Sequence, residues 1–328
     1  MKQKSFSYAK WGYIFSLPFV IAFLLFTLYP VIYTLFIGFT DLQGIIHPDT
    51  KILDNPFQNF QDILGSPVFQ TALKNTFVIW IWNFIPQMAL ALLLAAWFTN
   101  NRMKLKGKGF FKVIFYMPNI ITAATVAILF NTLFAYPKGP INDILMALKL
   151  ISDPYQFSQD GMASKLIVAF IQFWMWYGYT MIVLIAGILG ISPELFEAAD
   201  IDGANGMQKF LYVTIPNLKT ILLFTLVTSL IGGLQMFDIP KLFLNGGPNN
   251  ATLTASVFIQ NQAFSGSYMY NRAAAASMIM FLIIAVLSAI MFFVMRDKDE
   301  VALHKIVKAQ EKAYKKKMKE QKMAGGGK

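Results

Sequence analysis

The chain of 328 residues contains no cysteine and only two histidines, His47 and His304. Without cysteine, no disulfide, iron–sulfur cluster or thiolate-bound zinc can form, and two histidines so far apart do not make a metal site. The sequence also lacks the phosphate-binding patterns GxxxxGKS and GxxxxGKT, and it offers no nucleophile paired with a histidine. We therefore expect no catalytic residue, no metal and no cofactor in this chain.

Charge is also scarce, because charged residues make up 14% of the chain against roughly 25% in ordinary globular proteins. Hydrophobic residues reach 56%, and a helix needs about 20 of them in succession to cross a bilayer. The sequence predicts an all-α integral membrane protein with six transmembrane helices and without an internal repeat. The predicted spans are 11–39, 76–98, 110–134, 166–191, 218–244 and 273–295.

The net charge of +11 lies mainly in alternate segments between the spans. The start, the loops after the second and fourth spans, and the tail hold 21 Lys and Arg residues, whereas the opposite loops hold seven. The positive-inside rule then places both termini in the cytoplasm, and the pattern is not that of a nucleic-acid groove. We expect a retained cytoplasmic N-terminus (1–10), a transmembrane domain (11–295) and a basic cytoplasmic tail (296–328), which either lies on anionic lipid headgroups or is solvated.

The cytoplasmic loop 192–217 is more than a connector. Ser192 can cap a helix with Pro193 at its first position, and Glu194 then lies in the first turn, where a carboxylate is favoured. A turn at Gly203 separates this helix from a second one, predicted over 204–213. Apolar residues beside acids make the helix pair either a docking element for a partner protein or an interfacial pair on the lipid headgroups.

The loop contains residues at a fixed spacing: Glu197, Ala198, Ala199, Asp202, Gly203 and Ala204, followed by Phe210, Ile215 and Pro216. This run resembles the EAA signature of permeases from binding-protein-dependent ABC importers, and the spacing matches without a gap. In that family the helix lies in a cleft of the ATPase subunit and transmits nucleotide-driven closure. The resemblance implies the coupling role for the EAA and DGA residues of the run, above all Glu197, Ala198 and Gly203.

Further short motifs are distributed along the chain: Tyr29 with Pro30, Asn59 with Phe60, Asn75 with Thr76, Pro118 with Asn119, Gly139 to Asn142, and Gly246 to Pro248 with Thr252. They resemble the six-span, maltose/oligosaccharide-type first permease of sugar importers. The resemblance implies a bacterial or archaeal cytoplasmic-membrane protein that pairs with a second homologous permease. It also implies two cytoplasmic ABC ATPase subunits, which bind ATP and magnesium, and an extracellular or periplasmic solute-binding protein.

Two helical faces could line a path for sugar, which needs aromatic platforms and amide or hydroxyl partners. Residues at helical spacing supply one face in the fourth span and another in the fifth, although such residues also serve helix packing. In the importers that these segments resemble, the corresponding parts hold the sugar. The candidates are Gln172, Trp176, Tyr179 and Thr180 in the fourth span, and Ser229, Gly233, Gln235 and Met236 in the fifth.

Three alternatives stay open at this point. The importer could carry another solute, such as a polyamine, phosphate or glycerol phosphate, although the uncharged aromatic face argues against strongly charged substrates. An ion-coupled secondary transporter would usually carry intramembrane charges, and the predicted spans are nearly free of them. A membrane scaffold would explain the cytoplasmic loop but not the aromatic and amide faces.

Overall fold

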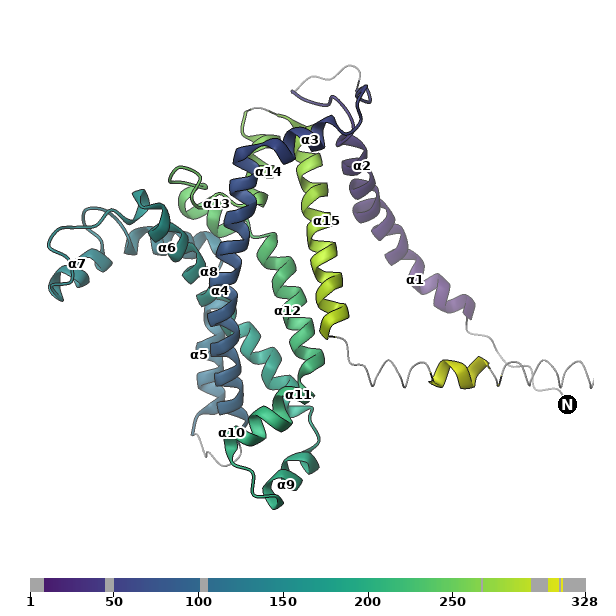
Figure 1. The fold of residues 1–328 in the computed structure, drawn as a ribbon, viewed down its shortest axis with the longest axis vertical. Helices are drawn as coiled ribbons and strands as arrows, with labels where there is room; N and C mark the ends of the chain where they lie inside the picture. Colours follow the sequence, from purple (N-terminus) through teal and green to yellow (C-terminus); the bar gives the residue numbers. More distant parts are fainter. Residues whose placement is uncertain are drawn as a thin grey trace, which may run out of the picture. The chain divides into compact units, whose positions relative to one another are not determined.

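The computed structural model describes residues 9–44, 50–100, 106–266, 268–295, 306–312 and 314. Within these ranges the chain is helical, and the one extended pairing is an isolated bridge between Thr40 and Ile52 (Figure 1). The all-α membrane fold predicted from the sequence is therefore confirmed. The expected tail (296–328) and the expected N-terminus (1–10) lie for the most part outside the described residues.

The helices follow one another along the chain with three short π or 3₁₀ turns between them. Their bounds are α1 Ala9–Phe23, a π turn Leu24–Leu28, α2 Tyr29–Ile37, α3 Gln58–Gly65, α4 Pro67–Thr99, α5 Lys108–Ile120, α6 Ala123–Leu133, α7 Pro140–Ala147, a 3₁₀ turn Phe157–Gln159, α8 Gly161–Leu189, α9 Pro193–Ile201, α10 Gly206–Lys209, a π turn Phe210–Thr214, α11 Ile215–Asn217, α12 Lys219–Leu234, α13 Asp238–Leu244, α14 Ala255–Phe264 and α15 Tyr270–Met295.

Five helical segments of the described chain are long and apolar enough to cross a membrane, and the bent pair of α5 and α6 is either a sixth, broken span or a re-entrant loop. Two of the predicted spans are interrupted. The span predicted over 110–134 breaks after Ile120, and the chain bends there by 91°. The span predicted over 218–244 loses helical geometry at 235–237, between α12 and α13. Apolar periodicity does not reveal such breaks, because the residues around them remain apolar.

Both π turns precede a proline by two residues. The turn Leu24–Leu28 is followed by Pro30, and the turn Phe210–Thr214 is followed by Pro216. A proline ring collides with the carbonyl four residues earlier and has no N–H to donate, so a widened turn lets the helix continue past it. Pro216 does not end the helical segment, which continues from the π turn through α11 towards α12.

The chain divides into two compact units. The first comprises residues 1–81, 123–169 and 233–284, and the second comprises residues 82–122, 170–232 and 285–328. In the first unit, a core formed by α3, α4, α14 and α15 surrounds Phe69 and Phe258, whose ring centroids are 5.4 Å apart. α13 packs against α6 in the same unit.

Buried amides tie the loops of the first unit to its helices. The Asn75 side chain on α4 donates to the carbonyl oxygens of Asn250 (2.7 Å) and Leu253 (3.1 Å). The Asn59 side chain donates to the carbonyl oxygens of Gly38 and Thr40, both at 2.9 Å. These bonds join segments far apart in the sequence and fix the loops in one geometry.

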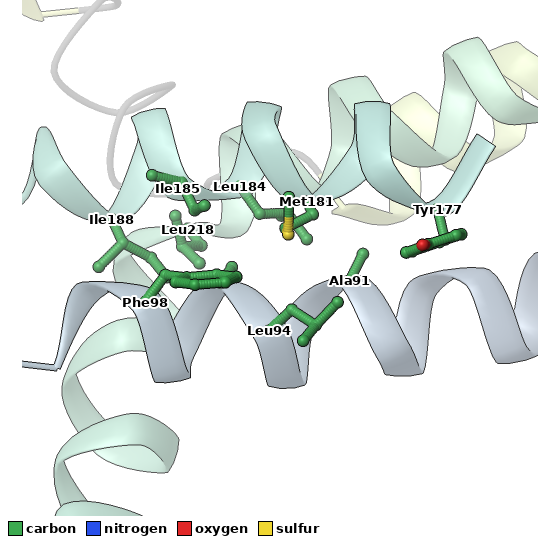
Figure 2. Close-up of a cluster of buried hydrophobic side chains, with 10 residues drawn as sticks. Ala91, Leu94, Phe98, Tyr177, Met181, Leu184, Ile185, Ile188 and Leu218 are labelled. Carbon is green, nitrogen blue, oxygen red and sulfur yellow. The ribbon is translucent and has the colours of Figure 1, made fainter. Parts of the chain in front are cut away.

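The second unit has an apolar core between α4 and α8. Figure 2 shows the side chains of Ala91, Leu94 and Phe98 directed from α4 towards those of α8. Met181 and Leu184 on α8 are completely buried there. The same core includes Tyr177, Ile185, Ile188 and, from the residue between α11 and α12, Leu218.

Candidate coupling loop and substrate path

The predicted cytoplasmic loop forms a helical hairpin of α9 and α10 within the second unit. Ser192 occupies the N-cap of α9 as predicted, and Pro193 is the first helical residue. The Ser192 side chain makes no capping hydrogen bond, however, and its carbonyl oxygen instead accepts from the amide of Leu195 at 3.2 Å. Glu194 lies in the first turn, where the helix dipole favours a carboxylate.

Gly203 reverses the chain after α9. Its φ of +76° lies in the left-handed region, which glycine adopts without the cost that a β-carbon imposes. The amide of Ala204 donates to the Ala199 carbonyl at 2.9 Å, and the amide of Gly203 donates to the Asp200 carbonyl at 3.1 Å. This pair of bonds is the Schellman arrangement, which satisfies the last carbonyls of a helix. The turn predicted at Gly203 is thus a helix C-cap.

A capping box begins α10 immediately after this turn. The Asn205 side chain accepts from the Gln208 amide at 2.9 Å, and the Gln208 side chain accepts from the Asn205 amide at 2.8 Å. The two bonds satisfy amides that the start of a helix leaves without partners. The sequence reasoning placed the second helix here but missed this capping box, whose signal is the pair of amide residues three positions apart.

The hairpin presents most of the predicted coupling residues to its surroundings. Glu197, Ala198, Asp202 and Gly203 are exposed, whereas Ala199 and Ala204 are partly buried. Ile201 is 87% exposed, and Leu195 and Met207 of the same hairpin are also exposed, so the hairpin carries apolar surface that another molecule can cover. The space around Gly203 is open, since a β-carbon there would meet nothing within 4 Å.

The candidate path residues on α8 do not share one environment. Trp176 and Tyr179 are exposed, and their rings meet edge to face with centroids 5.9 Å apart. Gln172 is partly buried. These three side chains carry no formal charge and combine aromatic faces with polar groups, which is the chemistry that a sugar needs.

Thr180, in contrast, is 2% exposed, and its hydroxyl is already engaged. It accepts from the Gln87 side chain at 2.8 Å and donates to the Trp176 carbonyl at 3.2 Å. Gln87 therefore joins α4 to α8 inside the second unit. In this structure Thr180 is placed to hold helices together and is not exposed to a solute.

The candidates of the fifth predicted span divide between the two units. Ser229 belongs to the second unit and is partly buried, whereas Gly233, Gln235 and Met236 belong to the first. A β-carbon on Gly233 would lie 2.0 Å from Cδ1 of Trp80, so the indole of α4 occupies that space.

Gln235 is exposed at the break after α12, and Met236 is buried. The Met236 carbonyl accepts from the Thr254 hydroxyl at 3.0 Å, which satisfies a backbone group that the break leaves without a helical partner.

Close contact at Gly178 brings α5 against α8 within the second unit. A β-carbon at this position would lie 2.0 Å from the carbonyl oxygen of Phe115, so no other residue fits without moving the backbone. The Asn119 side chain donates to the Met175 carbonyl at 3.2 Å and joins the same two helices. Sequence spacing gave no signal for this contact, because the partners are about 60 residues apart.

Asp160 anchors the start of α8. Its carboxylate accepts from the amides of Met162 (2.7 Å) and Ala163 (3.0 Å) and from the Tyr155 hydroxyl. The hydroxyl bond and then the two amide bonds hold the pKa of Asp160 below its ordinary value of 3.8. The same hydrogen bond raises the pKa of Tyr155 above 10.0.

The long apolar helices and the exposed hairpin are those of a multi-span membrane subunit. Residues 75–297 match the family of binding-protein-dependent transport system inner membrane components, and the chain belongs to that family. It is 32% identical to a lactose transport system permease of Rhizobium radiobacter over 289 residues, which are 88% of this chain and 94% of that protein. It is also 32% identical to an arabinooligosaccharide permease of Bacillus subtilis strain 168 over 279 residues, 85% of this chain and 86% of that one.

A solved structure shows the same fold. The chain is similar to a protein in the crystal structure of a bacterial ABC transporter involved in import of the acidic polysaccharide alginate, with a TM-score of 0.73 and 25% identity. The match covers 87% of this chain and 94% of the solved one. The resemblance to permeases of binding-protein-dependent importers, stated from the sequence, is confirmed by these matches.

Proposed function

We propose that this chain is a permease subunit of an ATP-driven importer of sugars or oligosaccharides. The observation that carries the proposal is the exposed hairpin of α9 and α10, which lies inside the family-matched region and bears the EAA-type residues. An apolar residue as exposed as Ile201, flanked by Glu194 and Glu197, suits a partner protein more than water.

The proposed assembly contains a second homologous permease and two cytoplasmic ATPase subunits. ATP and magnesium bind to those ATPases, and this chain contributes half of the translocation path. Closure of the ATPases moves the hairpin, and the permease pair changes from inward-facing to outward-facing. A solute-binding protein delivers the sugar on the outer side. Both termini of this chain lie in the cytoplasm.

The proposed sugar contacts are the exposed side chains of the candidate set, with Trp176 and Tyr179 as aromatic platforms. The lactose and arabinooligosaccharide relatives support a neutral disaccharide or oligosaccharide. A panel for substrate screening should contain lactose, arabino-oligosaccharides and an acidic oligosaccharide, because the solved relative takes part in import of an acidic polysaccharide.

Affinity purification of the chain from its native membrane in mild detergent, followed by mass spectrometry, tests the assembly. Two variants accompany the wild type: Gly203→Pro, which cannot adopt the φ of +76°, and Gly206→Ala, at which a β-carbon would meet nothing within 4 Å. We expect a second permease and an ATPase with the wild type and with Gly206→Ala. The ATPase should be lost from Gly203→Pro while the second permease remains.

Recovery of the wild type alone, under conditions that preserve other ABC complexes, would contradict the proposal. Retention of the ATPase by Gly203→Pro would contradict the role of the hairpin while leaving the importer assignment intact. The two outcomes therefore separate the class of protein from the assignment of its coupling site.

The orientation can be tested by single-cysteine labelling, since the chain has no cysteine of its own. Met207→Cys in the hairpin and Leu150→Cys after α7 form a matched pair, because both native side chains are 67% exposed. In intact cells a membrane-impermeant thiol reagent should label position 150 and should reach position 207 only after lysis. The reverse pattern would contradict cytoplasmic placement of the hairpin.

A further inference from the structure

The α9–α10 hairpin contains an ion pair that connects its two helices. Lys209 Nζ on α10 lies 2.7 Å from Asp200 Oδ1 on α9, and the two residues are nine positions apart. The Lys209 side chain is only 15% exposed, although the Asp200 side chain is 40% exposed. Only the Lys209 side of the pair is shielded, so salt screens the pair somewhat less than one between two fully exposed side chains.

The pair spans the turn between the two helices, from Asp200 on α9 to Lys209 on α10. The Schellman bonds close α9 onto 203–204, and the capping box closes Asn205 onto Gln208. Each of those sets holds one end of one helix. The Asp200–Lys209 pair instead fixes the distance between the two helices around Gly203.

The placement of the pair leaves the exposed face of α9 free for a partner. At 100° per residue, Glu194, Ala198 and Ile201 fall on one side of the helix, whereas Asp200 is displaced from their centre by about a third of a turn. Lys209 precedes the π turn Phe210–Thr214, which continues through α11 to α12. A load applied to α9 can therefore pass through the ion pair to the segment that leads into α12.

We propose that Asp200 and Lys209 are positioning residues that form a strut between the ATPase-contacting helix and the helix leading to the translocation path. This inference rests on the proposed function. The strut makes α9 and α10 move as one body, so that closure of the ATPases displaces α12. Without the ion pair, the hairpin bends at Gly203, and movement of α9 is not transmitted to α12.

The test uses the complete transporter reconstituted in proteoliposomes with its binding protein. Three variants are compared with the wild type: Asp200→Lys, Lys209→Asp, and the double exchange of both residues. Each single change places like charges together, and the double exchange restores an opposite pair. Three quantities are measured: co-purified ATPase, basal ATP hydrolysis, and hydrolysis and uptake stimulated by the loaded binding protein.

We expect the single variants to retain the ATPase and basal hydrolysis but to lose at least about fivefold in stimulated hydrolysis and uptake, the lower end of usual coupling energies. The double exchange should restore most of that loss. A purely structural role would reduce the recovered complex and leave its stimulated activity per complex unchanged.

The proposed strut would be overturned if the single variants kept wild-type stimulated hydrolysis and uptake. It would also be overturned if the double exchange restored neither activity above the level of the single variants. Loss of the ATPase from the single variants would also overturn it, because the pair would then belong to the docking surface. Failure of the proposed function is seen separately, as a wild type that brings no ATPase at all.

Discussion

Each of the two units is stabilised internally by a different kind of interaction. Of the fourteen buried polar residues in the described chain, nine lie in the first unit and five in the second. In the first unit, Asn59 and Asn75 connect helices to loops through backbone carbonyls. In the second, α4 and α8 meet through apolar side chains, and Gly178 lets α5 approach α8 closely.

The difference matters because the two kinds of contact respond differently to displacement. A hydrogen bond from an amide to a specific carbonyl weakens steeply when its geometry changes. Apolar contact is non-directional, so packed helices can slide by small amounts with little loss. We therefore expect the first unit to act as a fixed frame, whereas the second unit, which carries the α9–α10 hairpin, should allow small movements between close-packed helices.

The largest effect is expected where the second unit has no space. Gly178→Ala places a β-carbon 2.0 Å from the Phe115 carbonyl oxygen, and we expect a loss of about 3 kcal/mol in the free energy of unfolding. The apparent unfolding temperature of the purified complex would show it. Gly232→Ala is the control, because a β-carbon there meets nothing within 4 Å, and it should leave the temperature unchanged or raise it. Equal effects of the two changes would contradict the close contact.

The next effect tests the frame of the first unit. Asn59→Leu keeps the number and branching of the side-chain heavy atoms but removes the bonds to the carbonyls of Gly38 and Thr40 and the bond from the Asn271 side chain at 3.2 Å. Buried groups left without partners should cost about 2 kcal/mol in unfolding free energy. The same thermal measurement applies, with Asn131→Leu, at an exposed position of α6 in the same unit, as the control. If Asn59→Leu left the unfolding temperature unchanged, the buried amides would not be what stabilises this unit.

A smaller effect is expected for an amide in the second unit. Gln87→Met removes one side-chain bond to Thr180, whose hydroxyl still donates to the Trp176 carbonyl. We expect a loss of no more than about 1 kcal/mol, less than for Asn59→Leu. If Gln87→Met proved the more damaging of the two in the same thermal series, the contrast between the units would be wrong.

The smallest effect concerns acid stability of the first unit. The folded-state pKa of Asp160 lies below its ordinary value of 3.8, so its stabilising contribution is present above that value and is lost as the pH falls through the folded pKa. Unfolding temperature measured between neutral pH and about pH 3 should therefore fall more steeply for the wild type than for Asp160→Asn. Parallel curves would show that this carboxylate contributes nothing.

Much of the fold could be predicted from the sequence, because apolar length and charge asymmetry are strong local signals. The breaks in two spans could not. Gln235 to Phe237 are compatible with a helix, and the break depends on the Thr254 hydroxyl, which bonds to the Met236 carbonyl from 18 positions away. The start of α4 at Pro67 was also missed, because polar residues such as Gln70 and Lys74 extend the helix beyond its apolar stretch.

The candidate site residues were likewise predictable where the signal was local and not where it depended on packing between distant segments. The position of the hairpin followed from local signals, namely Ser192, Pro193 and the turn at Gly203. The burial of Thr180 did not, because helical spacing places it near Trp176 and Tyr179 without showing that Gln87 covers its hydroxyl. The contact of Trp80 with Gly233 likewise depends on packing between distant segments.

The most direct test of the account is uptake into proteoliposomes that contain the purified complex. Labelled oligosaccharide should accumulate only when ATP is present on the side of the hairpin and the loaded binding protein is on the other side. Asp200→Lys should reduce that uptake without loss of the ATPase subunit. Accumulation driven by an ion gradient in the absence of ATP would contradict the importer assignment.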